Sequence, residues 1–117
     1  MIDNHLTQML EKFLDVTSAR HSLITANMAN IDTPGYHTRD IDFRSELQRA
    51  LRSPAGAAAP VARAVPGLLE RPDGNNVSLD REGIALAETQ IQFRLGIELL
   101  QHEFHKTLTA INEGNGQ

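Results

Sequence analysis

Residues 79–111 have the sequence LDREGIALAETQIQFRLGIELLQHEFHKTLTAI, in which apolar residues recur every three or four positions. The positions with this spacing are Leu79, Gly83, Leu86, Gln90, Phe93, Ile97, Leu100, Phe104, Thr107 and Ile111. Most of them are large and apolar, and a repeat sustained over about four heptads is typical of a coiled-coil seam. We therefore predict one long helix, which begins after a cap at Ser78 and ends before Gly114.

Another long helix is predicted for the N-terminal segment, residues 1–31. Its apolar residues recur at spacings of three and four, which gives one face a seam. The predicted seam positions are Leu6, Leu10, Phe13, Ile24 and Ile31. Asp3 or Asn4 can cap the start of this helix. Pro34 disfavours helical geometry at Thr33 and so marks its end.

The middle of the chain divides into two parts. Residues 32–52 contain the sequence Thr33-Pro34-Gly35-Tyr36, which suits a type II turn, followed by a short amphipathic helix that starts near Phe43. Residues 53–76 are rich in Ala, Pro and Gly and keep no steady period, so we expect a flexible loop or linker. An alternative for the region around 65–69 is a docking segment.

These elements predict an all-α fold in which two long terminal helices (1–31 and 77–117) pair as a coiled coil. The chain has 117 residues, four Phe, one Tyr and no Trp, so little aromatic area is available for a core. Several seam positions are polar: Thr17, Arg20, Asn27 and Gln90. Polar seam residues weaken a pair of helices but specify register and partner. We therefore expect the helices to complete their burial against other chains.

Composition limits the classes of function. The formal net charge of −4 argues against non-specific nucleic-acid binding. The absence of cysteine excludes disulfides, thiolate metal sites and cysteine nucleophiles. No apolar run approaches the roughly 20 residues of a membrane helix, so no direct membrane insertion is expected. The N-terminus lacks the apolar core of a secretory signal peptide, and any export would use another route.

The candidate functional motif lies at the end of the N-terminal helix and consists of Asn27, Asn30 and the segment Thr33-Pro34-Gly35-Tyr36. Two asparagines three residues apart share a helix face and can bond orphan carbonyl groups or a neighbouring chain. Tyr36 offers an apolar ring with a polar tip, which suits an interface. An ordinary helix C-cap followed by a Pro-Gly turn would explain the same residues.

This motif resembles the N-terminal motif of the bacterial flagellar axial proteins, the family of rod, hook and hook-associated proteins. The segments 39–43 and 76–82 are similar to those of proximal-rod members, which are also short. The resemblance covers both terminal helices and the turn. Gly83 departs from it, because a larger residue is common there.

The resemblance implies a structural subunit of the periplasmic basal-body rod and no enzyme. Such subunits leave the cytoplasm through the flagellar type III export machinery and polymerise through their terminal helices. The implied partners are copies of the chain itself, other rod and basal-body proteins, and the export machinery. Neither a cofactor nor a small-molecule substrate is implied.

Other chemistry finds less support in the sequence. His102, His105 and Glu98 could form a metal site, and a small zinc hydrolase would need all three, but the spacing is not that of a zinc protease. Asp40 and Asp42 form a carboxylate pair without a nearby nucleophile or phosphate loop. A cytoplasmic coiled-coil adaptor remains the alternative function, because it explains the seams but not the Asn and Thr-Pro-Gly-Tyr motif.

Overall fold

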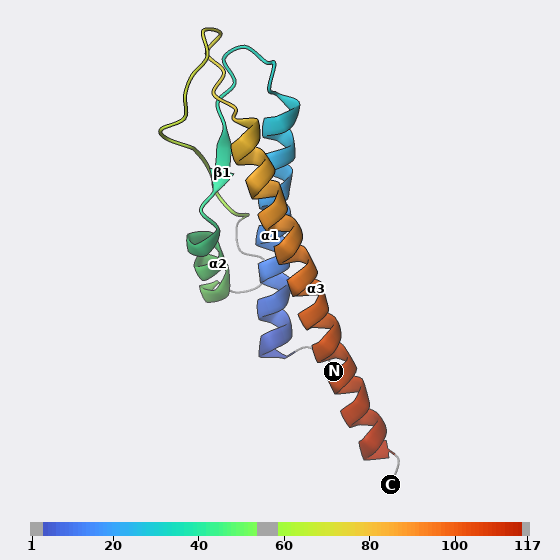
Figure 1. The fold of residues 1–117 in the computed structure, drawn as a ribbon. Coiled ribbons are helices and arrows are strands. Elements are labelled where there is room, and N and C mark those ends of the chain that lie inside the picture. Colours follow the sequence, from blue (N-terminus) through green and yellow to red (C-terminus); the bar gives the residue numbers. More distant parts are fainter. Residues whose placement is uncertain (1–3, 54–58, 116–117) are drawn as a thin grey trace.

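The computed structural model describes residues 4–53 and 59–115. The elements in chain order are α1 (His5–Ala29), β1 (Arg39–Ile41), α2 (Phe43–Arg52), β2 (Ala62–Ala64) and α3 (Leu79–Asn115). They form an elongated molecule with extents of 72 × 25 × 18 Å. Helices α1 and α3 lie side by side and antiparallel, whereas α2 and the strands pack beside α1 (Figure 1). The long terminal helices predicted from the sequence are therefore present.

Local hydrogen bonds explain where the long helices begin and end. The Asn4 side chain accepts a hydrogen bond from Thr7 N–H at 2.8 Å and caps α1. At the start of α3, Ser78 Oγ accepts from Arg81 N–H at 3.3 Å. Helix α1 ends at Ala29, two residues before the expected Ile31. Helix α3 continues through Gly114 to Asn115, so this glycine does not end it.

The face of α3 that α1 covers is lined by small and polar residues. Ala85, Thr89 and Gly96 are buried there at spacings of four and seven. A Cβ atom on Gly96 would lie 2.7 Å from Leu14 Cδ2, so the glycine permits the close approach of the two helices. On α1, Leu10 and Ile24 are buried in the same contact region.

The structure bears out only part of the expected contact between the two predicted seams: the ring of Phe93 meets His21 of α1 with centroids 5.9 Å apart, whereas other seam residues of α3 face solvent. The seam residues of α3 that remain exposed are Leu79, Ile97, Phe104 and Ile111, with exposed fractions of 43–53%. Leu86, Phe93 and Leu100 are half-buried, as are Phe13 and Ile31, whereas Leu6 is exposed. The mean direction of the α3 seam lies about a quarter turn from that of the buried residues Ala85, Thr89 and Gly96, so only one edge of the seam reaches α1.

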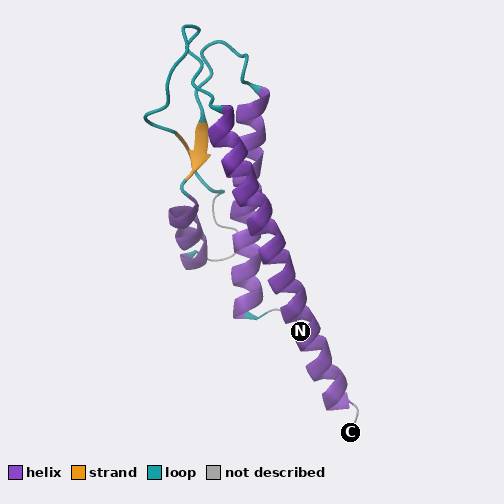
Figure 2. Cartoon of the chain, in the orientation of Figure 1, coloured by secondary structure: helices purple, strands orange, loops and turns teal. Residues whose placement is uncertain are grey.

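The fold is mostly helical, as predicted, but β1 and β2 also form a two-stranded antiparallel sheet that the all-α prediction did not include (Figure 2). Arg39 pairs with Ala64, and Ile41 pairs with Ala62. Within the segment expected to be a flexible loop, residues 62–64 therefore form strand β2. Residues 54–58 of that segment lie outside the described part of the chain.

Side chains of α2 bind the backbone of residues 59–61, the segment that leads into β2. The Glu46 carboxylate accepts a hydrogen bond from Val61 N–H at 2.5 Å, and Arg49 donates to the Ala59 carbonyl at 2.8 Å. The hydrogen bond from Arg49 and that from Val61 N–H together lower the pKa of Glu46. These non-local contacts order a segment whose composition alone predicts a linker.

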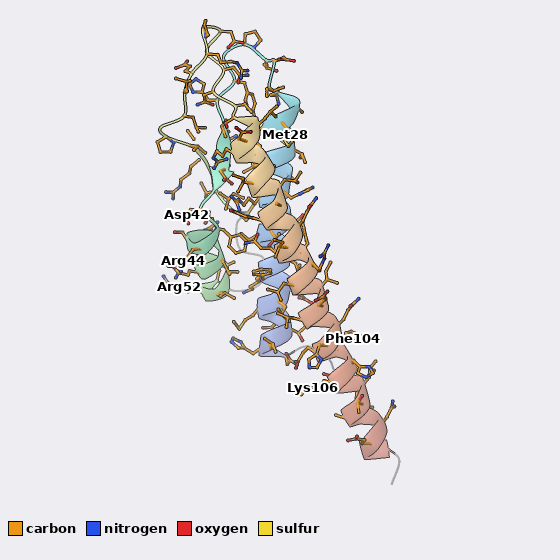
Figure 3. The ribbon with its side chains drawn as sticks, in the orientation of Figure 1. Met28, Asp42, Arg44, Arg52, Phe104 and Lys106 are labelled. Carbon is orange, nitrogen blue, oxygen red and sulfur yellow. The ribbon has the colours of Figure 1, made fainter. Side chains whose placement is uncertain are left out.

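Helix α2 is itself tied to α1. Asp42 caps its start by accepting from Ser45 N–H at 3.3 Å. Lys12 of α1 donates to the carbonyls of Ala50 and Ser53 at 2.8 and 3.0 Å, where the helix dipole favours a positive charge. Phe13 and Phe43 meet edge to face with ring centroids 5.4 Å apart. Asp42, Arg44 and Arg52, labelled in Figure 3, lie on the part of the chain away from α3.

Two glycines of α3 provide a test of the close helix contact. Gly83→Ala meets no atom within 4 Å, so we expect it to raise the free energy of unfolding by about 1 kcal/mol through helix propensity. Gly96→Ala places its new methyl group against Leu14 and Phe13, so this gain should be cancelled or reversed. Urea denaturation followed by circular dichroism measures both variants. Equal stabilisation by the two substitutions would contradict the close packing at Gly96.

Candidate functional site

The site is centred on the side-chain amide of Asn27, which is fully buried near the end of α1. Its nitrogen donates to the Arg39 carbonyl at 2.8 Å and to Glu82 Oε1 at 2.5 Å. Its oxygen accepts from the Tyr36 hydroxyl at 3.0 Å and from Arg39 N–H at 3.2 Å. Both donors and both lone pairs of the amide are therefore used. One side chain joins α1, the segment that leads into β1, and α3.

Ionic contacts extend from this amide across the same three elements. Glu82 is fully buried, and its second oxygen accepts from Arg81 at 2.7 Å. Arg81 also donates to Asp40 at 2.6 Å, and Arg20 of α1 donates to the same carboxylate at 3.1 and 3.3 Å. Arg20 reaches back to Glu88 of α3 at 2.9 Å. The charges alternate in sign along the whole series, so each ion has an opposite neighbour.

The electrostatic consequence is clearest at Asp40. Burial by itself raises the pKa of this carboxyl, but hydrogen bonds from Arg20 and Arg81 outweigh the effect of burial. The Ile41 N–H adds a further hydrogen bond at 2.7 Å, and the net result is a lowered pKa. Burial likewise lowers the pKa of Arg20, but its two carboxylate partners reverse this and raise it. Both shifts favour the charged forms of Asp40 and Arg20.

The rest of the predicted motif forms the exit from α1. The Asn30 side chain donates to the Ala26 carbonyl at 2.8 Å and accepts from the Thr33 hydroxyl at 3.0 Å. Tyr36 N–H donates to the Thr33 carbonyl at 3.2 Å. Gly35 has a φ of 76°, which side-chain-bearing residues rarely adopt. Pro34 and Gly35 are both exposed.

A second segment, residues 71–77, braces this exit from the other side. Buried Asn75 donates to the carbonyls of Asn30 and Thr33 at 2.9 and 2.8 Å. Arg71 donates to the Ile31 carbonyl and, at 3.3 Å, to the Val77 carbonyl. These bonds give the Ile31 carbonyl a partner and add side-chain donors to the Asn30 and Thr33 carbonyls, which also accept from the N–H groups of Thr33 and Tyr36.

Residues 71–77 also contact the Pro34-Gly35 segment directly. Gly35 N–H donates to the Asp73 carbonyl at 2.9 Å. A Cβ atom on Gly74 would lie 3.2 Å from Gly35 Cα, so two backbones meet closely here. Farther along, Asn76 accepts from Thr38 N–H at 2.7 Å. The entry into α3 and the exit from α1 therefore form one hydrogen-bonded unit.

The structure thus places all six predicted motif residues in one region, but they differ in burial and in hydrogen-bond partners. Asn27 is in the interior and Tyr36 is half-buried, whereas Asn30 and Thr33 bond locally and the Pro-Gly pair faces solvent. Sequence reasoning did not assign five partners in this region: Arg20, Asp40, Arg71, Asn75 and Glu82. For Arg20 and Glu82 the sequence signal was a polar residue within or beside an apolar seam, whereas Asp40, Arg71 and Asn75 lie outside the seams and gave no such signal.

The alternative chemical sites have no comparable organisation. His102, His105 and Glu98 occupy exposed positions on α3. Among residues 4–53 and 59–115, no three or more His, Asp or Glu side chains are grouped so as to hold a metal ion. Within the same residues, none of the helices combines the length and apolarity needed to cross a bilayer.

Comparison with known proteins identifies the family. No family model matches the chain. The flagellar basal body rod protein FlgB of Cereibacter sphaeroides is 35% identical over 84% of this chain and 87% of its own length. The protein of the same name from Salmonella typhimurium is 31% identical over 90% of this chain and 91% of its own length. The chain belongs to the FlgB family of flagellar basal body rod proteins.

Further relatives extend this similarity at lower identity. The FlgB protein of Escherichia coli is 28% identical over 90% of this chain. In each of these comparisons the matched part includes most of both proteins, so the similarity is not confined to the Asn and Thr-Pro-Gly-Tyr motif. Membership of the FlgB family confirms the resemblance to flagellar axial proteins, and it describes a structural protein of the basal body rod.

The role of Asn27 in this FlgB-family chain can be measured against that of Asn30. Asn27→Ala leaves Glu82 buried without its amide donor and removes the acceptor of Tyr36 and Arg39. We expect a loss of about 3 kcal/mol in the free energy of unfolding. Asn30→Ala removes only hydrogen bonds near the surface, and we expect a loss of about 1 kcal/mol. Chemical denaturation of both variants measures the two losses of unfolding free energy, and equal losses would contradict a central role for Asn27.

The stability of the chain should fall in acid. Since the folded state lowers the pKa of Asp40, its contribution is fully present above the unfolded value of about 3.9 and is lost as the pH falls through the lower folded value. Asp40→Asn should be less stable than the parent at pH 7 and should lose less stability on acidification. Thermal melts between pH 7 and about pH 3 test this. The pH dependence of stability that remains in the variant should include a contribution from Glu46. Parallel stability curves for the parent and the variant would contradict the assignment to Asp40.

Proposed function

We propose that this chain is a structural subunit of the proximal part of the flagellar rod, which polymerises through its two terminal helices. Membership of the FlgB family supports the rod assignment. The observation that carries the proposal is the exposure of large apolar residues along α3, including Leu79, Ile97 and Phe104. Patches of this kind mark interaction sites on soluble chains.

The candidate site has a structural role in this proposal. Asn27 and Glu82 fix α1 against α3 at one register, and Asn75 fixes the loop that joins them to the exit turn. A subunit must present its contact surfaces in one fixed geometry if repeated addition is to give a regular polymer. The Asn and Thr-Pro-Gly-Tyr motif would therefore order the ends of both helices for contact with a neighbouring subunit.

We further propose that the chain reaches its site through the flagellar type III export machinery without a cleaved signal peptide. Its partners would then be that machinery, copies of itself, and other rod and basal-body proteins in the periplasmic rod. The lack of cysteine and the small aromatic content support passage of an unfolded chain. The interior also contributes little apolar area, since Ala85, Thr89 and Gly96 line the contact between the helices.

A cytoplasmic coiled-coil adaptor would also use exposed apolar residues on a helix. It does not account for the similarity to FlgB proteins over most of the chain. The rod subunit is therefore the function that the site and the family support best.

A genetic test uses two Pro-Gly pairs of the same chain. Gly35 and Gly67 have φ values of 76° and 80°, and neither glycine has an atom within 4 Å of its would-be Cβ. Pro34→Ala with Gly35→Ala disturbs the motif, whereas Pro66→Ala with Gly67→Ala introduces the same backbone strain elsewhere. In the source bacterium lacking its own copy of the gene, we expect the unaltered chain and the 66/67 variant to restore swimming, and the 34/35 variant to reduce it at least tenfold.

The same strains separate the possible outcomes. Normal swimming by the 34/35 variant would contradict the assembly role of the motif. Normal swimming and normal rods in the strain without the gene would contradict the rod function itself. Retention of the chain in the cytoplasm with a fixed stoichiometric partner would instead support the adaptor. Electron microscopy of isolated basal bodies shows whether the rod is present in each strain.

A further inference from the structure

Helix α3 carries large apolar residues on both sides of the face that α1 covers. The buried residues Ala85, Thr89 and Gly96 define the direction toward α1. Successive residues of a helix are rotated by about 100°. This rotation separates the exposed apolar residues of α3 into two groups, about 90° and about 105° away on opposite sides.

We define the Phe104 stripe as Ile97, Phe104, Leu108 and Ile111 on one side of α3. We define the Ile84 stripe as Ile84, Ile91, Leu95 and Leu99 on the other side. The members of the first stripe are 43–45% exposed and those of the second are 44–65% exposed. Because α1 lies between the two directions, a single neighbouring helix cannot cover both stripes at once.

The two stripes also occupy different lengths of α3. The Ile84 stripe lies where α3 runs beside α1, while much of the Phe104 stripe lies where α1 no longer accompanies it. The side chain of Asn4, the cap of α1, reaches Glu103 at 3.4 Å, so α3 continues alone beyond that position. Figures 1 and 3 show this projecting end, with Phe104 labelled near its start.

The lengths of the two stripes match. From Ile97 to Ile111 is about 21 Å along a helix, and from Ile84 to Leu99 is about 23 Å. Both are made of aliphatic or aromatic side chains. The acidic neighbour Glu88 of the Ile84 stripe is paired with Arg20 at 2.9 Å, which partly neutralises its charge.

We propose that the Phe104 stripe of one copy packs against the Ile84 stripe of a second copy. This inference rests on the proposed function, since a rod subunit must meet further copies of itself. The midpoints of the stripes are about 12 residues apart, so parallel copies in this contact would be shifted by about 19 Å along the helix axis. The projecting end of α3 then lies against the two-helix part of the next copy.

The unlike nature of the two stripes determines the form of the assembly. A two-fold dimer uses the same patch on both copies and leaves no patch free. Here each copy would use its Phe104 stripe for one neighbour and its Ile84 stripe for another. Such head-to-tail contacts continue indefinitely unless the rotation closes a ring. The geometry of α3 therefore favours an open polymer.

Complementary variants of the full-length chain test this contact. The first variant is Phe104→Glu with Leu108→Glu, and the second is Ile91→Glu with Leu95→Glu. Each adds two carboxylates to one exposed stripe and leaves the other stripe intact. The control is His105→Glu with Thr109→Glu, which adds two carboxylates to exposed positions of α3 outside both stripes. Circular dichroism confirms that all four proteins have the same helix content.

Sedimentation velocity over a concentration series up to about 1 mM, within the range of weak association, gives the decisive comparison. We expect the parent chain and the control to form species larger than a dimer. Each stripe variant alone should need at least a tenfold higher concentration to associate. An equimolar mixture of the two variants should form a 1:1 heterodimer that grows no further, because only one intact contact is left.

Three results would overturn the inference. They are a monomeric parent chain at the highest concentration, association of either stripe variant equal to that of the parent, and a mixture that forms no heterodimer. Swimming of the gene-deleted strain separates this inference from the rod function. If the parent gene and both stripe variants restore motility equally, the chain is a rod protein that assembles through other surfaces.

Discussion

The side-chain amide of Asn27 is the interaction on which the arrangement of the helices depends. It is fully buried, and each of its four hydrogen-bonding positions has a partner. A buried amide or carboxylate without partners is costly, so Asn27 and Glu82 must remain opposite each other. That register places Gly96 of α3 opposite Leu14 of α1, where only a residue without a side chain allows the observed approach. A polar contact at one end of the helices therefore determines the steric contact at the middle.

This chain buries an unusual number of polar residues beside a small apolar core. Polar side chains such as Thr17, Thr89 and Glu82 are fully buried, while large apolar residues of α3 face outward. Polar groups in an interior give geometric specificity, because each requires a particular partner. Apolar groups on the outside contribute free energy only when another chain covers them. The buried polar contacts therefore fix the geometry of the chain, whereas the exposed apolar residues would stabilise it only on association. A subunit of a larger structure requires both.

The sequence predicted those features that depend on local pattern. Helical periodicity revealed both α1 and α3, and the asparagine and Pro-Gly motif located the region around Asn27. The face of α3 that contacts α1 was not predicted, because the strongest apolar pattern in α3 lies largely outside that contact. Strand β2 was missed because Ala62–Ala64 is too short to show a period, and its position depends on Glu46 and Arg49. Arg71 and Asn75 bond to groups 40 and 45 residues away, and such partners leave no trace in local spacing.

The antiparallel arrangement of α1 and α3 also determines when the chain can fold. Asn4 contacts Glu103 across 99 positions of sequence, and Asn27 contacts Glu82 across 55. Contacts between distant positions require closure of a long loop, which makes folding slow. When a chain emerges with its N-terminus leading, α1 appears long before any residue of α3 is available to cover it. Until the final third appears, the N-terminal helix lacks its main partner, so the order of emergence itself delays folding.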